Sequence, residues 1–166
     1  MLTKRCFAPV VNADTRLLIL GSLPGEASLQ AGRYYAHPQN QFWRLLGGVL
    51  GQELAALPYA ERLALLLAHG IGLWDVVAEA QRSGSLDSDI RAVQGNDLAG
   101  LLAELPALGA LAFNGQKAAA IGLRQLGALA PRYTIHTLPS SSPAHTLALS
   151  QKLAVWQALR ASLSAA

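Results

Sequence analysis

Short continuous apolar runs alternate along the chain with longer segments that mix apolar and polar residues. Four of these runs have the length and composition of strands that are covered on both faces of a sheet. They are Arg16–Leu20, Ile71–Val77, Leu108–Phe113 and Tyr133–Leu138. Helices are predicted over residues 39–50, from Pro58 to His69, over 98–104 with Asp97 as its cap, over 116–126 and over 147–163. The alternation predicts a single α/β domain over residues 1–166, a three-layer α/β/α sandwich with a mostly parallel sheet of about four strands.

Two segments show neither pattern. Residues 1–15 are predicted to form an irregular lead-in that ends near Asp14. The segment Arg82–Asn96 is polar and contains glycine, which predicts a long loop. Because long loops in compact domains are often lids, this second segment is a candidate for contact with a bound ligand.

The unusual residues of the chain gather where the predicted strands end. In an open parallel sheet, ligands bind beyond the carboxyl ends of the strands, so loops at those ends are expected to meet. Four such segments are Gly21–Pro38, Trp74-Asp75, Asn114-Gly115 and Pro139–His145. The first of them continues to Trp43 and combines glycines, prolines, adjacent tyrosines, a histidine and an asparagine. This composition suits a loop that holds a flat, polar, aromatic ligand.

Composition limits the classes of function. The 166 residues carry a net charge of +3, and this weak positive charge permits nucleic-acid binding without indicating it. No apolar run approaches the roughly 20 residues of a membrane span, and the start has no apolar segment typical of a signal peptide, so a cytoplasmic protein without membrane contact is expected. Cys6, the only cysteine, excludes an internal disulfide and a four-cysteine iron–sulfur cluster. The histidines lack metal-ligand spacing, so no metal site is expected.

Two common chemistries fit the loops poorly. The segment Gly21–Gly25 follows a strand, but it has neither nucleotide-phosphate pattern of spaced glycines, and Pro24 removes an amide donor. Ser140–Ser142 and His145 suggest a serine hydrolase, but the chain has no Gly-x-Ser-x-Gly elbow. These serines also suit turns that cap the following helix, and that alternative stays open.

Recognition of a nucleobase fits better. A flipped base needs an aromatic face to stack on and amide groups that read its edge. Tyr35, with Tyr34 beside it, offers the face, and Asn40 and Asn114 offer the amides, whereas Phe42 and Trp43 are expected in the core. The backbone of Gly21–Leu23 and the three serines suit close approach to the base or to phosphates. The segment Pro143–Leu147 is a candidate wedge that enters the stack vacated by the base.

Several motifs together resemble the uracil-DNA glycosylase superfamily. They are Gly21-Ser22-Leu23-Pro24-Gly25, the run from Tyr34 to Trp43, Leu73-Trp74-Asp75-Val76, Gly84-Ser85-Leu86-Asp87, Phe113-Asn114-Gly115 and the run from Leu138 to His145. Within the superfamily they are most similar to the DNA-deoxyinosine (hypoxanthine-DNA) glycosylases, over roughly residues 8 to 160. The resemblance implies an α/β/α fold, a duplex DNA substrate, extrusion of the damaged base and cleavage of its N-glycosidic bond without metal or cofactor. A monomer is expected.

The resemblance also implies roles for individual residues. Leu23 stands where the mismatch-specific branch has its catalytic asparagine, and in the deoxyinosine branch the catalytic asparagine matches Asn40. Asp75 is a second candidate for activating water, although a structural carboxylate is the competing interpretation. Substrate binding is predicted for Gly21, Ser22, Leu23, Tyr35, His37 and Asn114, and DNA binding for Ser140, Ser141, Ser142, Pro143, Ala144 and His145.

The prediction is therefore a monofunctional DNA glycosylase of base excision repair that leaves an abasic site. Hypoxanthine is the expected base, with uracil or xanthine as further candidates. A uracil- or mismatch-specific glycosylase is one alternative. A nucleic-acid-binding module of the same fold without catalysis is another, and a small-molecule α/β enzyme is a third. Sequence spacing does not rank the bases.

Overall fold

The computed structural model describes residues 3–81 and 91–163. Its larger sheet has four strands in the order β3-β2-β6-β7, and every neighbouring pair is parallel. The strands are β2 (Leu17–Gly21), β3 (Ile71–Asp75), β6 (Ala110–Asn114) and β7 (Thr134–Leu138). All five residues of β2 and of β6 are buried, which explains why these central strands are continuous apolar runs. The predicted parallel sheet is confirmed.

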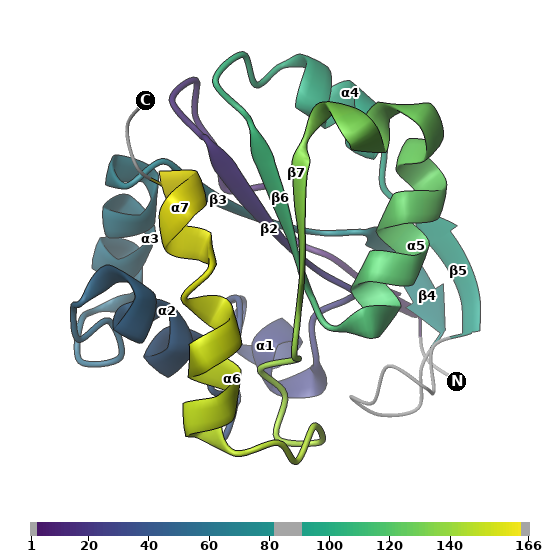
Figure 1. Cartoon of the computed structure of the whole chain (residues 1–166). Coiled ribbons are helices and arrows are strands. Elements are labelled where there is room, and N and C mark those ends of the chain that lie inside the picture. Colours follow the sequence, from purple (N-terminus) through teal and green to yellow (C-terminus); the bar gives the residue numbers. More distant parts are fainter. Residues whose placement is uncertain (1–2, 82–90, 164–166) are drawn as a thin grey trace.

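Helices cover both faces of this sheet (Figure 1). Leu17 and Ile19 point into one core with α2 (Phe42–Leu50), α3 (Tyr59–Ala68), α6 (Leu149–Trp156) and α7 (Leu159–Leu163). Leu18 and Leu20 point into the other core with α4 (Leu98–Ala103) and α5 (Gln116–Leu126). The alternation of side chains along a strand thus separates two hydrophobic layers and confirms the three-layer sandwich. A 3₁₀ turn, η2 (Gly127–Arg132), connects α5 to β7.

A second sheet lies outside the prediction. The strands β1 (Thr3–Arg5), β4 (Val77–Gln81) and β5 (Arg91–Gly95) pair in antiparallel fashion in the order β1-β4-β5. The predicted irregular lead-in is therefore wrong at residues 3–5. The predicted loop Arg82–Asn96 is wrong at residues 91–95, while 82–90 lie outside the described residues. Such short strands depend on backbone pairing with distant segments, which apolar periodicity does not reveal.

The chain leaves the central sheet earlier than predicted. The expected strand Ile71–Val77 divides into β3 and β4 at Val76, whose N–H donates to the Gly21 carbonyl over 2.8 Å. The next amide, of Val77, donates to the Ser22 carbonyl over 3.0 Å. The end of β2 thus turns the chain toward the small sheet and leaves Asp75 at the carboxyl edge of the large one.

Helix boundaries also differ from the prediction in three places. A short helix, α1 (Glu26–Ala31), lies inside the predicted first loop and ends at Gly32, whose φ of 66° is left-handed. The helix predicted from residue 39 begins at Phe42. The helix predicted over 147–163 is divided into α6 and α7. The predicted cap is confirmed, since Asp97 accepts a hydrogen bond from the Gly100 amide over 3.0 Å.

No helix formed by the described residues combines the length and the apolar character needed to cross a membrane.

His136 gives the fold a testable pH dependence. It lies on the edge strand β7, where its Nε2 is 2.8 Å from Ser162 Oγ, and burial lowers the pKa of His136 below its ordinary 6.5. The unfolded chain therefore binds this proton at a higher pH than the folded chain does. We expect the free energy of unfolding to fall as the pH drops from about 6.5 toward the folded pKa. Urea unfolding over this range is expected to show a shallower pH dependence for His136→Gln, and equal slopes would contradict the assignment.

Candidate active site

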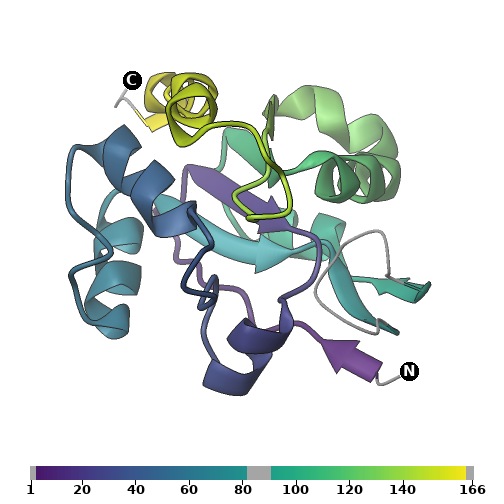
Figure 2. The ribbon, with the colours of Figure 1, turned by 90° about the horizontal axis from the view of Figure 1, so that it is seen from below.

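A cavity of about 550 Å³ opens at the carboxyl ends of the four parallel strands. Figure 2 views the molecule onto this edge, where the loop after β7 crosses above the sheet beside the segment between β2 and α2. Apart from Thr146 and Leu147 of the candidate wedge, the structure brings together around this cavity the residues for which a catalytic or binding role was predicted. They are Asn40, Gly21, Ser22, Leu23, Tyr35, His37, Asn114, Ser140, Ser141, Ser142, Pro143, Ala144 and His145. Asp75, Pro24, Gly25, Ala27, Ser28 and Tyr34 complete the lining.

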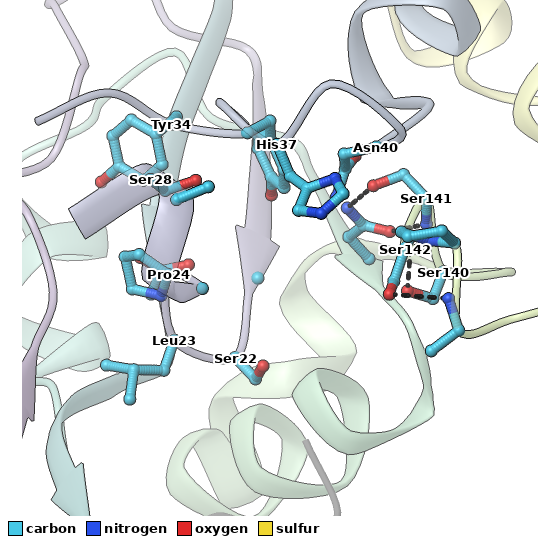
Figure 3. Close-up of a pocket in the computed structure, with 18 of the residues that line it drawn as sticks. Ser22, Leu23, Pro24, Ser28, Tyr34, His37, Asn40, Ser140, Ser141 and Ser142 are labelled. Carbon is cyan, nitrogen blue, oxygen red and sulfur yellow. Dashed lines mark hydrogen bonds between the residues drawn. The ribbon is translucent and has the colours of Figure 1, made fainter. Parts of the chain in front are cut away.

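The segment Gly21–Gly25 does not place a reactive side chain at the position of Leu23. Leu23 is buried in the core beneath α4 and α5, and in Figure 3 its side chain points away from the other labelled groups. Gly21 is a point of close approach, because a Cβ added there would lie 2.7 Å from Asp75 Oδ1 and 3.1 Å from Tyr35 Oη. The buried Asp75 carboxylate and the Tyr35 hydroxyl therefore lie directly over the end of β2. Only glycine leaves room for both.

Tyr35 has an unusual backbone conformation. Its φ of 55° is the only positive value at a non-glycine position among the described residues. Such left-handed conformations cost energy for a bulky residue and are concentrated at functional sites. The ring of Tyr35 stacks on Phe42 with centroids 3.8 Å apart and planes 9° apart, so one face of the ring is covered. The predicted stacking of a base therefore requires the opposite face of the ring.

Tyr34 has a structural role. It is buried, its hydroxyl donates to the Ala8 carbonyl over 3.2 Å, and its amide donates to Tyr59 Oη over 2.9 Å. Burial raises the pKa of Tyr34, and the negative charge of Asp75 raises it further. Tyr34 therefore stays neutral and fixes the segment that presents Tyr35.

We call the segment Pro139–His145, which follows β7, the serine loop. Asn40 and His37 lie on the side of the cavity that faces this loop (Figure 3). Asn40 Oδ1 accepts the Phe42 amide over 3.0 Å in an Asx turn just before α2, whose N-cap is Gln41, and this bond fixes the direction of the side-chain amide. The second lone pair of Oδ1 and both Nδ2 protons are not needed for this bond. His37 Nδ1 accepts the Gln39 amide over 3.0 Å, so a neutral His37 ring carries its proton on Nε2.

Asn114, at the end of β6, is held by two hydrogen bonds to one residue. Its Oδ1 accepts the Ser141 amide over 2.9 Å, and its Nδ2 donates to Ser141 Oγ over 2.9 Å. Both side chains are buried. Asn114 thus joins the end of β6 to the loop that follows β7. One Nδ2 proton and one Oδ1 lone pair of Asn114 remain for a ligand.

The loop after β7 is built from local turns and three anchors. Ser140 Oγ accepts the Ser142 amide, and Ser142 Oγ accepts the Ala144 amide. Neither serine caps the following helix, because α6 begins at Leu149 with Ala148 at its N-cap. The anchors are a bond from the Gln41 amide to the Ser141 carbonyl, one from Trp156 Nε1 to the Pro139 carbonyl, and one from Lys152 Nζ to the Ser142 carbonyl.

Lys152 was not predicted as a site residue. Its side chain is fully buried, and burial lowers its pKa. The ammonium group donates to the Ser142 carbonyl over 3.2 Å and thereby holds the serine loop from below. By contrast, the following residues of the candidate wedge, Pro143–Leu147, are exposed. The hydrogen-bonded part of the loop, residues 139–142, thus carries an exposed segment that includes Leu147.

A comparison of two substitutions tests the join between Asn114 and Ser141. Asn114→Ala leaves the buried Ser141 amide without an acceptor, which costs about 1–3 kcal/mol of stability and loosens the serine loop. Ser141→Ala keeps that backbone bond and loses only the hydroxyl contact. We expect Asn114→Ala to lower both the melting temperature and the rate of base release more than Ser141→Ala does. Thermal unfolding and a base-release assay measure the order, and a reversed order would contradict the structural role.

The described part of the chain contains no cluster of side chains suited to a metal site. Among residues 3–81 and 91–163, no three His, Cys, Asp or Glu side chains come together in a way that could hold a metal ion.

Comparison with known proteins decides the family. The model of the uracil DNA glycosylase superfamily matches residues 8–160. The chain belongs to this superfamily. The match includes every loop that lines the cavity, so the geometry described above is that of a DNA glycosylase, an enzyme of base excision repair that acts on DNA.

Individual relatives cover almost the whole glycosylase chain. It is 39% identical over 155 residues to a protein of Methanosarcina barkeri named hypoxanthine DNA glycosylase, covering 92% of this chain and 95% of that one. A protein of Methanosarcina acetivorans with the same name is 39% identical over 158 residues, covering 94% and 97%. A solution NMR structure described as a candidate uracil DNA glycosylase of Methanosarcina acetivorans has a TM-score of 0.86 at 38% identity, covering 98% of this chain and 99% of that one.

Proposed function

We propose that this DNA glycosylase removes hypoxanthine, the deaminated form of adenine, from duplex DNA. The observation that carries the proposal is the single cavity that gathers Tyr35, Asn40, His37 and Asn114 beside the serine loop. Relatives of 39% identity that are named hypoxanthine DNA glycosylase support the choice of base. The enzyme is expected to act as a monomer on cytoplasmic DNA, as the sequence predicts.

The binding step uses the aromatic and amide groups. The flipped base enters the cavity and stacks on the face of Tyr35 that Phe42 leaves uncovered. The remaining Nδ2 proton of Asn114 donates to a carbonyl oxygen or ring nitrogen on the edge of the base. Ser140 and Ser142 hold the phosphates next to the flipped nucleotide, and Leu147 at the exposed tip fills the space that the base leaves in the duplex.

The chemical step separates charge, and the cavity is arranged for this. The bond between the base nitrogen and C1′ breaks, positive charge develops on the sugar, and water adds its hydroxyl to C1′. The water proton balances the departing base, which leaves neutral. Asn40 orients the water through the Oδ1 lone pair that the Phe42 amide does not use. The Asp75 carboxylate, buried in the cavity wall, favours the positively charged sugar.

His37 suits the departing base. Because its Nδ1 accepts the Gln39 amide, its Nε2 proton is available to the cavity. A hydrogen bond from Nε2 to the base stabilises the negative charge that accumulates as the glycosidic bond breaks. A neutral amide such as Asn40 is a weak base. Stabilisation of the leaving group is therefore expected to supply much of the lowering of the activation barrier.

Uracil is a second candidate base. It presents carbonyl and ring N–H groups similar to those of hypoxanthine, and the structural relative described as a candidate uracil DNA glycosylase has a TM-score of 0.86. A panel of duplexes with inosine, deoxyuridine or deoxyxanthosine opposite each normal base tests the proposal, with alkali cleavage at abasic sites as readout. We expect inosine duplexes to be processed fastest. Preferential processing of deoxyuridine would assign the enzyme to uracil, and binding without cleavage would indicate a module that has lost catalysis.

A further inference from the structure

A second cavity, of about 370 Å³, lies against the base cavity. Tyr34, Tyr35, His37 and Asn40 line both cavities, so the segment 34–40 is the wall between them. The outer lining comes from separate segments of the chain and carries three arginines. These are Arg33 after α1, Arg44 in the first turn of α2, and Arg62 in α3. No predicted site role covers them.

Two of the three guanidinium groups are held over aromatic rings. Arg33 Cζ lies 5.5 Å from the centroid of Tyr59, and Arg62 Cζ lies 5.2 Å from the centroid of Trp43. Arg62 also donates from Nε to the Leu57 carbonyl over 2.8 Å and from a terminal nitrogen to the Ala55 carbonyl over 3.1 Å. These contacts orient the charged groups before any ligand arrives. A ligand therefore binds with less loss of side-chain entropy.

The positive charge of this cavity is not neutralised. No Asp or Glu lines it, and none of the three arginines pairs with a carboxylate of residues 3–81 or 91–163. Burial raises the pKa of Tyr59, whereas the hydrogen bond from the Tyr34 amide and, to a smaller extent, the charges of Arg33 and Arg62 oppose that rise. Arg33 and Arg44 are exposed, so a ligand reaches them from solvent. The chemistry fits an anion with several acceptor oxygens, and guanidinium groups bind phosphate oxygens in this way.

We propose that this arginine cavity binds phosphodiester groups of the damaged DNA strand beside the flipped nucleotide. The inference rests on the proposed function, because the base cavity fixes where that nucleotide lies. A strand whose base enters the first cavity past Asn40 and His37 passes over the 34–40 wall and places its next phosphates against Arg33 and Arg44. The serine loop holds the strand on the opposite side of the nucleotide. Two-sided anchoring of this kind keeps an extruded nucleotide out of the duplex.

The salt dependence of DNA binding tests the proposal. The variant Arg33→Ala/Arg44→Ala removes the two exposed charges and keeps Arg62, whose backbone contacts support the fold. Each lost phosphate contact lowers the slope of log K against log salt by about 0.9, so we expect a reduction of about 1.8 for the double variant. Fluorescence anisotropy with an undamaged duplex and with a duplex that contains a stable abasic analogue gives the slopes.

A matched control removes the same charge elsewhere. Arg124 and Arg132 are exposed, belong to α5 and η2 on the other face of the sheet, and line neither cavity. The slope of Arg124→Ala/Arg132→Ala is expected to equal that of the unmodified protein. Equal slopes for both double variants would overturn the proposal.

Two further results separate the possible explanations. Inorganic phosphate alone is titrated by calorimetry in the absence of DNA. Micromolar binding that the Arg33→Ala/Arg44→Ala variant loses, with unchanged DNA slopes, would make the cavity a site for free phosphate and overturn the proposal. If the unmodified protein releases no base from any duplex but the slope still falls, the proposed function fails and the DNA-binding cavity stands.

Discussion

Replacement of Asn40 with alanine is expected to lower the single-turnover rate of base release by about 10²–10³-fold, the usual effect of removing one oriented polar group from an active site. The reason is geometric. Asn40 lines the cavity, and the Phe42 amide fixes its side chain over a 3.0 Å hydrogen bond. The same substitution removes this hydrogen bond ahead of α2, so it also costs about 1 kcal/mol of stability. The rate is measured with enzyme in excess over an inosine duplex, and stability by urea unfolding.

A serine at the same position separates the two effects. A serine hydroxyl can accept a backbone amide two residues on, as Asn40 accepts the Phe42 amide, but it is too short to place water where the longer amide does. We expect Asn40→Ser to keep most of the stability and to lose base release as Asn40→Ala does. If Asn40→Ala released hypoxanthine within a few-fold of the unmodified rate, the catalytic role would belong to another group, with Asp75 the first candidate.

Replacement of Gly21 with alanine is expected to lower base release by about 10²-fold, the cost of misplacing reacting groups by roughly 1 Å. The added Cβ would lie 2.7 Å from Asp75 Oδ1 and 3.1 Å from Tyr35 Oη, so the carboxylate and the ring must move. Both line the cavity, and Tyr35 has the left-handed backbone that leaves it little freedom to adjust. We also expect a loss of about 1–3 kcal/mol of stability from overpacking.

Gly109 supplies the control for that change. It lies just before β6, and a Cβ added there would meet no atom within 4 Å. Gly109→Ala is therefore expected to keep both stability and base release, measured by the same assays. A Gly21→Ala protein as active as Gly109→Ala would show that the close approach of Asp75 and Tyr35 to β2 is unimportant for catalysis.

The layers and the place of the site follow from local sequence features. The run Leu17–Leu20 is apolar at every position because β2 is covered on both faces, and a pattern of that kind is visible without a structure. Parallel strands bring their carboxyl ends to one edge, so loops far apart in sequence meet there. This is why Asn40, Asn114 and Ser140–Ser142 line a single cavity as the sequence predicts.

The features of the fold and site that the sequence does not predict depend on contacts between distant residues. The small sheet of β1, β4 and β5 is held by backbone pairing, and β1 has only three residues, too few for a periodic signal. The pairing of Asn114 with Ser141 joins residues 27 positions apart. The serine loop accepts a hydrogen bond from Lys152, a buried lysine in α6. The sequence alone would place a helical lysine on the surface. The three arginines of the second cavity lie in separate segments of the chain, and only the fold brings them together.

The structure also changes the interpretation of individual side chains. Asn114 reads as a free amide in the sequence, but two hydrogen bonds to Ser141 leave it one donor and one acceptor site for a base. Tyr35 offers one face rather than two, because Phe42 covers the other. Leu23 lies in the core, so the segment Gly21–Gly25 is expected to act through its backbone. We therefore expect the other polar side chains that face the cavity to carry the chemistry.

The most direct measurement is the chromatographic detection of the base that the purified protein frees from a duplex with a single inosine, under single-turnover conditions. We predict free hypoxanthine in a one-to-one ratio with alkali-labile abasic sites, and little release of either by the Asn40→Ala protein. A protein that binds this duplex but frees no hypoxanthine, while the matching deoxyuridine duplex yields uracil or neither duplex yields a base, would contradict the proposal.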